Sequence, residues 1–175
     1  MSHLNFYDKR KKSLFFNNLR FAGSKDPTIG VEIELQIIDP DSLDLTPQSA
    51  RILQLCHLEN ISRVKSEVHQ SMLEVDSEIS RDVKECFSFL KHRILQLHQI
   101  TERLGLQLGA TGTHPFQLWP DRLISNDNRY QELYKKYQWL IRRMNVYGMH
   151  VHIGVPTGDQ AIAICQQMIR YLPHL

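Results

Sequence analysis

Nine residues near the start of the chain alternate strictly between apolar and polar side chains. From residue 29 to residue 37 the odd positions are all Ile, Val or Leu, and the even positions are Gly30, Glu32, Glu34 and Gln36. Because side chains in a β-strand point alternately to opposite faces, this pattern predicts a strand with one buried face and one wet face. Glu32 and Glu34 then project together from the wet face.

A second predicted strand carries two histidines on one face. Residues 147–154 form an apolar run that is rich in β-branched side chains and has glycine at positions 148 and 154. His150 and His152 are two residues apart, so they project to the same side of a strand. The other side carries Met149, Val151 and Ile153. We expect that apolar side to be buried.

The spacing of apolar residues and of capping residues predicts the other elements. We expect helices over residues 4–21, 46–57, 80–104, 128–143 and 159–172, with Thr46, Ser80 and Asp159 as the N-caps of three of them. Two short strands broken near Gln70 are expected within residues 61–79, and another over residues 106–110. No linker or repeat interrupts this order. The prediction is a single α+β domain over residues 1–175, an antiparallel sheet with packed helices, which lacks an obvious closing element.

Composition and charge exclude several classes of protein. With 42% hydrophobic and 23% charged residues the chain is of an ordinary globular type, and its net charge of +2 gives no reason to expect a nucleic-acid partner. No apolar run approaches the roughly 18 residues of a membrane span, so we expect neither membrane insertion nor export. Cys56, Cys86 and Cys165 are far apart and form no CxxC pair. They are expected to be reduced, buried thiols of a cytoplasmic protein.

Neither polar pair specifies chemistry by itself. Glu32 and Glu34 alone are typical of a solvated strand surface, and His150 with His152 fits a metal site or a half-exposed surface equally well. Side by side, the two strands would line one cavity with several carboxylate oxygens and one or two imidazole nitrogens. That ligand set suits Mg²⁺ or Mn²⁺ better than structural zinc.

Two further glutamates would extend the same set. Glu67 and Glu74 add carboxylates if their segment folds alongside the first strand. Several carboxylates that converge without a cation repel one another and raise one another's pKa, so a bound divalent ion is the simplest reason to gather them. His114 is a weaker candidate, and packing of its loop is the expected role. No Walker, GxGxxG or GxSxG motif occurs in the sequence.

Four segments of the chain, taken in order, point to a known family. They are residues 28–36 (TIGVEIELQ), the segment from Glu67 to Glu74, residues 112–116 (GTHPF) and residues 148–154 (GMHVHIG). Together they resemble the carboxylate-amine ligase family, which is also called glutamate–cysteine ligase type 2. The last segment also resembles the metal-binding strand of glutamine synthetase, with which that family shares its catalytic fold.

The resemblance implies an ATP-dependent ligase in which Mg²⁺ ions clamp the nucleotide phosphates. An amino acid carboxylate would take the γ-phosphoryl group, and an amine acceptor would then displace phosphate from the acyl phosphate. By position, the metal ligands implied are Glu32, Glu34, Glu67, Glu74 and His150, and His152 is implied nearer the nucleotide. Such chemistry depends mainly on neutralising charge and on aligning the reactants.

The resemblance runs from Thr28 onward but covers only about the first half of the family's domain. We therefore expect a truncated ligase with reduced or no activity alone: either a fragment of the whole enzyme, or a chain that requires a homo-oligomer or a complementing chain to complete its site. Two alternatives remain at this point. One is a non-catalytic remnant that binds a divalent metal or a nucleotide, and the other is a small zinc hydrolase built on His150 and His152.

Overall fold

The structure is a computed structural model that describes residues 20–174. The helix expected over residues 4–21 lies almost wholly outside these residues. The described residues group into two compact units, one spanning Thr28–Ile153 and the other made of residues 20–27 and 154–174. None of the helices in residues 20–174 is long and apolar enough to cross a membrane.

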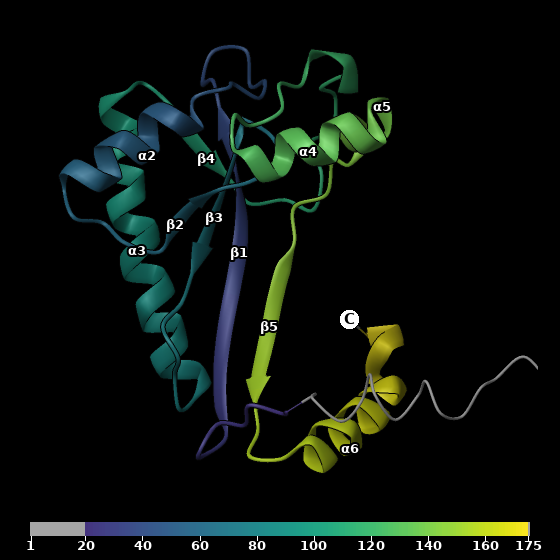
Figure 1. Cartoon of the computed structure of the whole chain (residues 1–175). Helices are drawn as coiled ribbons and strands as arrows, with labels where there is room; N and C mark the ends of the chain where they lie inside the picture. The colour runs from purple at the N-terminus through teal and green to yellow at the C-terminus, as the bar shows by residue number, and fades with distance from the viewer. Residues whose placement is uncertain (1–19, 175) are drawn as a thin grey trace, which may run out of the picture. The chain divides into compact units, whose positions relative to one another are not determined.

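The larger unit is built on a five-stranded antiparallel sheet (Figure 1). Its central strand is β1 (Thr28–Ile38), which confirms the strand predicted from the alternating pattern. On one side β1 pairs with β3 (Met72–Asp76), which in turn pairs with β2 (Val64–Ser66). On the other side it pairs with β4 (Gln107–Gly109) and β5 (Met149–Gly154). The predicted α+β fold and the two short strands within residues 61–79 are confirmed.

Two helices, α2 (Ser49–Leu58) and α3 (Val83–Arg103), provide the helical side of the hydrophobic core. They pack against the apolar side of the sheet, which carries the odd-numbered residues of β1. The fully buried members of this core include Ile37, Ile52, Leu73, Val75, Leu97 and Ile100. Burial of these side chains fixes which face of each strand points inward, and so leaves the even-numbered residues of β1 on the opposite face.

The start of α3 differs from the prediction. The N-cap is Asp82, whose side chain accepts a hydrogen bond from the backbone N–H of Glu85 at 2.8 Å. The predicted cap, Ser80, instead exchanges two backbone hydrogen bonds with Ile29, each 2.8 Å long. A tertiary bridge therefore holds Ser80 in extended backbone. Gly105, the residue after the C-cap Leu104, has a left-handed φ of +69°, which is common for glycine at that position.

The predicted cap of α2 is also wrong. Thr46 donates its backbone N–H to the carbonyl of Ile37 at 2.9 Å, which ties it to β1. The helix begins three residues later at Ser49, with Gln48 as an N-cap that makes no side-chain hydrogen bond to the helix.

The helix predicted over residues 128–143 is two helices, α4 (Asn128–Tyr137) and α5 (Trp139–Arg143). They are separated by Gln138, whose φ of 46° and ψ of −120° are incompatible with helix. The break allows Tyr130 of α4 and Ile141 of α5 to pack into one small cluster. This cluster positions α4 beside the candidate site described below.

His69, in the loop between β2 and β3, is almost fully buried and connects that loop to the end of α5. Its Nε2 lies 2.9 Å from the carbonyl oxygen of Met144, and its Nδ1 is buried without a hydrogen-bond partner in the described part of the chain. Burial is the main cause that lowers the pKa of His69 below its ordinary value of 6.5. The neutral imidazole is therefore the form that the folded protein accommodates.

We predict that this histidine contributes to acid sensitivity of the metal-free protein. The pKa of His69 is lower in the folded protein than in the unfolded chain. Its contribution to the free energy of unfolding is therefore complete above pH 6.5 and is lost as the pH falls below that value. In urea titrations with chelator present, His69→Gln should show a smaller loss of unfolding free energy between pH 7 and pH 5 than wild type. His92→Gln, on the exposed face of α3, should follow wild type. If wild type and His69→Gln lost the same unfolding free energy between pH 7 and pH 5, His69 would not be a source of the acid sensitivity.

The smaller unit contains α6 (Gly158–Met168) and a 3₁₀ turn, η2 (Ile169–His174). Thr157 caps α6 by accepting the backbone N–H of Gln160 at 3.3 Å, so the predicted cap at Asp159 is wrong by two residues. Residues 20–27 belong to the same unit through a backbone hydrogen bond from Ser24 to Val155 at 3.1 Å.

Two expectations about burial are wrong. The apolar face of β5 is exposed at all three positions, Met149, Val151 and Ile153. Within Thr28–Ile153, α2 and α3 pack against the other four strands, so neither helix shields this face. Cys56 and Cys86 are buried free thiols as expected, but Cys165 on α6 is exposed.

Candidate metal-binding site

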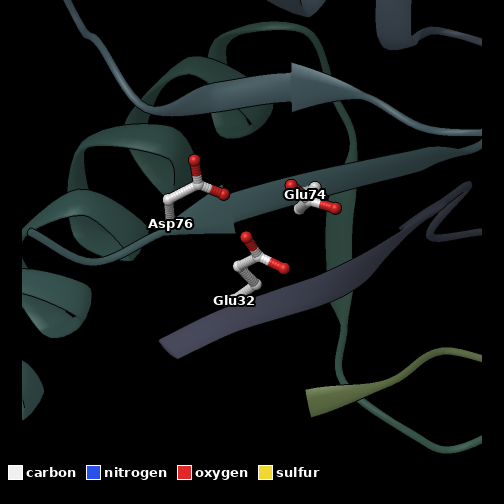
Figure 2. Close-up of side chains that lie close together, drawn as sticks. All are labelled: Glu32, Glu74 and Asp76. Carbon is white, nitrogen blue, oxygen red and sulfur yellow. The ribbon is translucent and has the colours of Figure 1, made fainter. Parts of the chain in front are cut away.

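Four carboxylates of β1 and β3 lie on one face of the sheet, and together with Glu67, which follows β2, they make up what we call the acidic face. The pairing of β1 with β3 places Glu32 directly opposite Asp76 and Glu34 directly opposite Glu74. Figure 2 shows the side chains of Glu32, Glu74 and Asp76 projecting from the two strands on the same side of the sheet. The strand alternation that buries the apolar face thus gathers acids on the other face.

The acidic face contains two triplets of closely spaced oxygen ligands. Glu32, Glu74 and Asp76 form the first triplet, and Glu34, Glu67 and Glu74 form the second. Within each triplet one ligand atom per residue lies within 4.8 Å of the others. Glu74 belongs to both triplets, so it is the central carboxylate of the face.

Asp76 was missing from the residues predicted to form a site. A signal for it was present, because Asp76 follows Glu74 by two residues and therefore shares its side of the strand. Its partner across the sheet, Glu32, is set by the register between β1 and β3, which brings together residues 44 positions apart.

The histidines of β5 lie beside Glu32. Nδ1 of His150 is 3.6 Å and Nε2 of His152 is 3.1 Å from the same carboxylate oxygen, Oε2 of Glu32. Both imidazoles are more than half exposed. The predicted convergence of the two polar strands is therefore present in the structure, although neither histidine belongs to a triplet.

Hydrogen bonds orient the carboxylates of the second triplet. The hydroxyl of Tyr130 donates to Oε1 of Glu67 at 2.8 Å, and the N–H of Val68 donates to Oε2 at the same distance. Burial, followed by the contact with Glu67, raises the pKa of Tyr130, which keeps its hydroxyl a donor. The backbone N–H of Gly148 donates to Oε2 of Glu34 at 2.7 Å. These bonds restrict the rotamers of two predicted ligands.

Glu74 and Asp76 share a cationic partner, Lys65 of β2. Its Nζ lies 3.2 Å from Oε1 of Glu74 and also forms an ion pair with Oδ2 of Asp76. Burial raises the pKa of Glu74 above 4.5 and its contact with Asp76 raises it further, while the hydrogen bond from Lys65 lowers it. The net effect is a pKa above the ordinary value, with burial as its largest cause.

A polar cavity of about 320 Å³ adjoins the second triplet. It is lined by Lys65, Ser66, Glu67, Glu74, Asp127, Arg129 and Tyr130. Asp127 caps α4 by accepting the N–H of Arg129 at 2.8 Å, so the start of this helix forms part of the wall. The cavity offers space for a small polar ligand next to the carboxylates.

His114 has the packing role expected of it. It is buried, its Nε2 lies 3.0 Å from the carbonyl oxygen of Leu43, and its Nδ1 accepts the N–H of Gln117 at 3.1 Å. Its ring also packs edge-on against Phe116, with 4.6 Å between the centroids. Both ring nitrogens therefore make hydrogen bonds to the backbone, at Leu43 and at Gln117.

The donor set fits a hard divalent cation. Each triplet offers three carboxylate oxygens, which are the ligands that Mg²⁺ and Mn²⁺ prefer, and imidazole nitrogens adjoin Glu32. Cys56 and Cys86 are buried in the core on the other side of the sheet, so they offer no thiolate to this site. The arrangement differs in this respect from a thiolate-rich structural zinc site.

A model of the glutamate-cysteine ligase family 2 matches residues 28–175, a range that begins at the first residue of β1. The chain belongs to this family. A protein of Gloeobacter violaceus is 39% identical over 157 residues, which are 89% of this chain and 42% of that protein. A protein of Bdellovibrio bacteriovorus is 40% identical over 148 residues, which are 85% of this chain and 39% of that protein. Both carry the name "Putative glutamate--cysteine ligase 2". The chain spans about two fifths of the length of these relatives.

Proposed function

We propose that this chain supplies the divalent-metal-binding part of an ATP-dependent carboxylate-amine ligase of the glutamate–cysteine type. The observation that carries the proposal is the pair of carboxylate triplets sharing Glu74 on one face of the sheet. Family membership supports the ligase chemistry, and the oxygen-rich geometry supports Mg²⁺ or Mn²⁺ as the ion.

The proposed ligands are the residues expected from the sequence, together with Asp76, which the geometry adds. They are Glu32, Glu34, Glu67, Glu74, Asp76 and His150. His152 is proposed to contact the nucleotide. When bound, Mg²⁺ or Mn²⁺ would neutralise phosphate charge. The chain's own part is to hold the carboxylates in register through β1 and β3 and to fix the orientation of Glu67 through Tyr130.

The proposed substrates are ATP, an amino acid carboxylate and an amine acceptor. Because the relatives are more than twice as long as the matched region, we propose that a further polypeptide segment completes the active site, either in the same chain or in a partner. The proposed substrate ATP is available in the cytoplasm, and free cysteines, of which this chain has three, persist in that reducing compartment. We therefore propose a cytoplasmic location.

The test is a complementation assay. The chain is co-expressed with the part of the Gloeobacter violaceus relative that follows the matched region, and the co-purified pair is given Mg²⁺, ATP, glutamate and cysteine. We expect phosphate release that requires both amino acids, and none when the chain carries Glu74→Gln. A co-purified pair that binds Mn²⁺ but forms no amide product would refute the ligase and leave a non-catalytic metal-binding protein.

One observation favours a second candidate, a zinc hydrolase. Glu32 lies within 3.6 Å of a nitrogen of both His150 and His152, so these three residues resemble a two-histidine, one-carboxylate zinc set. Metal analysis of the purified protein separates the candidates. Stoichiometric zinc that survives dialysis would support the hydrolase, whereas weakly held Mg²⁺ or Mn²⁺ supports the ligase.

A further inference from the structure

Lys65 occupies a distinctive place among the carboxylates. The pairing of β2 with β3 puts it directly opposite Glu74, on the acidic face. Its ammonium forms ion pairs with Glu74 and Asp76 and therefore contacts two of the three members of the first triplet. The two carboxylates are largely buried, with 13% of each side chain exposed, whereas 53% of the Lys65 side chain is exposed.

Within the described part of the chain, few positive charges lie around the first triplet to balance its carboxylates. Among the ion pairs of residues 20–174, Lys65 is the one permanently charged partner of the triplet. The other partners, His150 and His152, contact Glu32 and carry charge only when protonated. Without a bound metal ion, Lys65 is therefore the main counter-ion for Glu74 and Asp76.

We infer that Lys65 is an exchangeable counter-ion, which neutralises Glu74 and Asp76 in the metal-free protein and leaves them when a divalent cation binds. The inference rests on the proposed function and adds a regulating residue to the same site. The ammonium of Lys65 and a metal ion would compete for the same oxygens of Glu74 and Asp76. If both were bound to these oxygens, the two positive charges would repel each other. Lys65 is suited to exchange because its stem is flexible, its ammonium is readily hydrated and half of its side chain already lies in water.

The consequence is that Lys65 lowers the affinity of the site for metal and stabilises the site when it is empty. Lys65→Met keeps most of the stem and removes the charge. We expect this variant to bind Mn²⁺ about tenfold more tightly than wild type at low ionic strength, with a smaller difference at high salt. Its thermal midpoint without metal should fall below that of wild type, and Mn²⁺ should raise it more than it raises the wild-type midpoint.

Two controls separate charge competition from a general effect of mutation. Lys65→Arg retains the positive charge and should bind Mn²⁺ close to the wild-type affinity. Lys135→Met removes another lysine that is paired with a glutamate, Glu132 on α4, and should leave Mn²⁺ binding unchanged. Isothermal titration of the chelator-treated full chain with Mn²⁺ measures all four proteins without any assay of turnover.

Each outcome has a definite meaning. Tighter binding by Lys65→Met alone supports the exchange. If wild type binds Mn²⁺ and Lys65→Met binds it equally or more weakly, Lys65 does not compete with the ion, and the inference fails while the proposed metal site stands. If neither wild type nor Lys65→Met binds Mn²⁺, both the inference and the proposed function are overturned.

Discussion

Glu74→Gln is expected to weaken Mn²⁺ binding on the order of 100-fold or more, the largest effect of any single substitution on the acidic face. Glu74 is the carboxylate common to both triplets, so its loss removes a charged oxygen ligand from each of them. Glutamine keeps the size of the side chain and leaves the register of β1 and β3 intact. Isothermal titration with Mn²⁺ measures the change.

The same substitution should not destabilise the metal-free protein. Burial raises the pKa of Glu74 in the folded protein above its pKa in the unfolded chain. The contribution of Glu74 to the free energy of unfolding is therefore complete below the unfolded pKa and is lost as the pH rises through the folded pKa. At pH 7 the ionised carboxylate is therefore unfavourable, and the neutral amide should keep or raise the thermal midpoint. Glu132→Gln, on the exposed surface of α4, serves as the matched control and should change neither quantity. Unaltered Mn²⁺ affinity in Glu74→Gln would remove Glu74 from the site.

Leu73→Ala is expected to have the largest effect on stability, a loss of about 3 kcal/mol in the free energy of unfolding. Leu73 is fully buried at the centre of the sheet, where β3 pairs it with Leu35 of β1 and Ser66 of β2. Truncation leaves a cavity beneath the strand that also carries Glu74 and Asp76. Urea denaturation of the metal-free protein measures the loss.

The control for this change is Leu58→Ala, at the end of α2, where 67% of the side chain is exposed. Because this exposed side chain makes no capping hydrogen bond and joins no buried network, its truncation should change the free energy of unfolding by less than about 0.5 kcal/mol. If Leu73→Ala lost no more than this control, β3 would not lie in the core, and the register that aligns the carboxylates would be wrong.

Local patterns in the sequence were sufficient to predict the strands and most of the acidic face. Period-two alternation identified β1 and put Glu32 and Glu34 on its polar side, because one face of a half-buried strand must be apolar. The same reasoning put His150 and His152 together, and the structure brings both to Glu32.

Long-range pairing explains what the sequence left undetermined. Asp76 and Lys65 join the site through the registers of β3 with β1 and with β2, which single-strand periodicity does not define. The predicted caps at Ser80 and Thr46 failed because backbone hydrogen bonds to β1 hold both residues outside their helices. The break at Gln138 lacks the glycine or proline that normally signals one.

We propose that the acidic face binds a divalent cation through carboxylates of β1 and β3. The most direct test of this proposal is a crystal of the chain grown with Mn²⁺ and measured near the manganese absorption edge. We predict an anomalous peak coordinated by Glu74 and by at least one of its neighbours in a triplet, Glu32, Asp76, Glu34 or Glu67. A map with well-ordered carboxylates on both strands and no manganese between them would show that the acidic face is not a metal site.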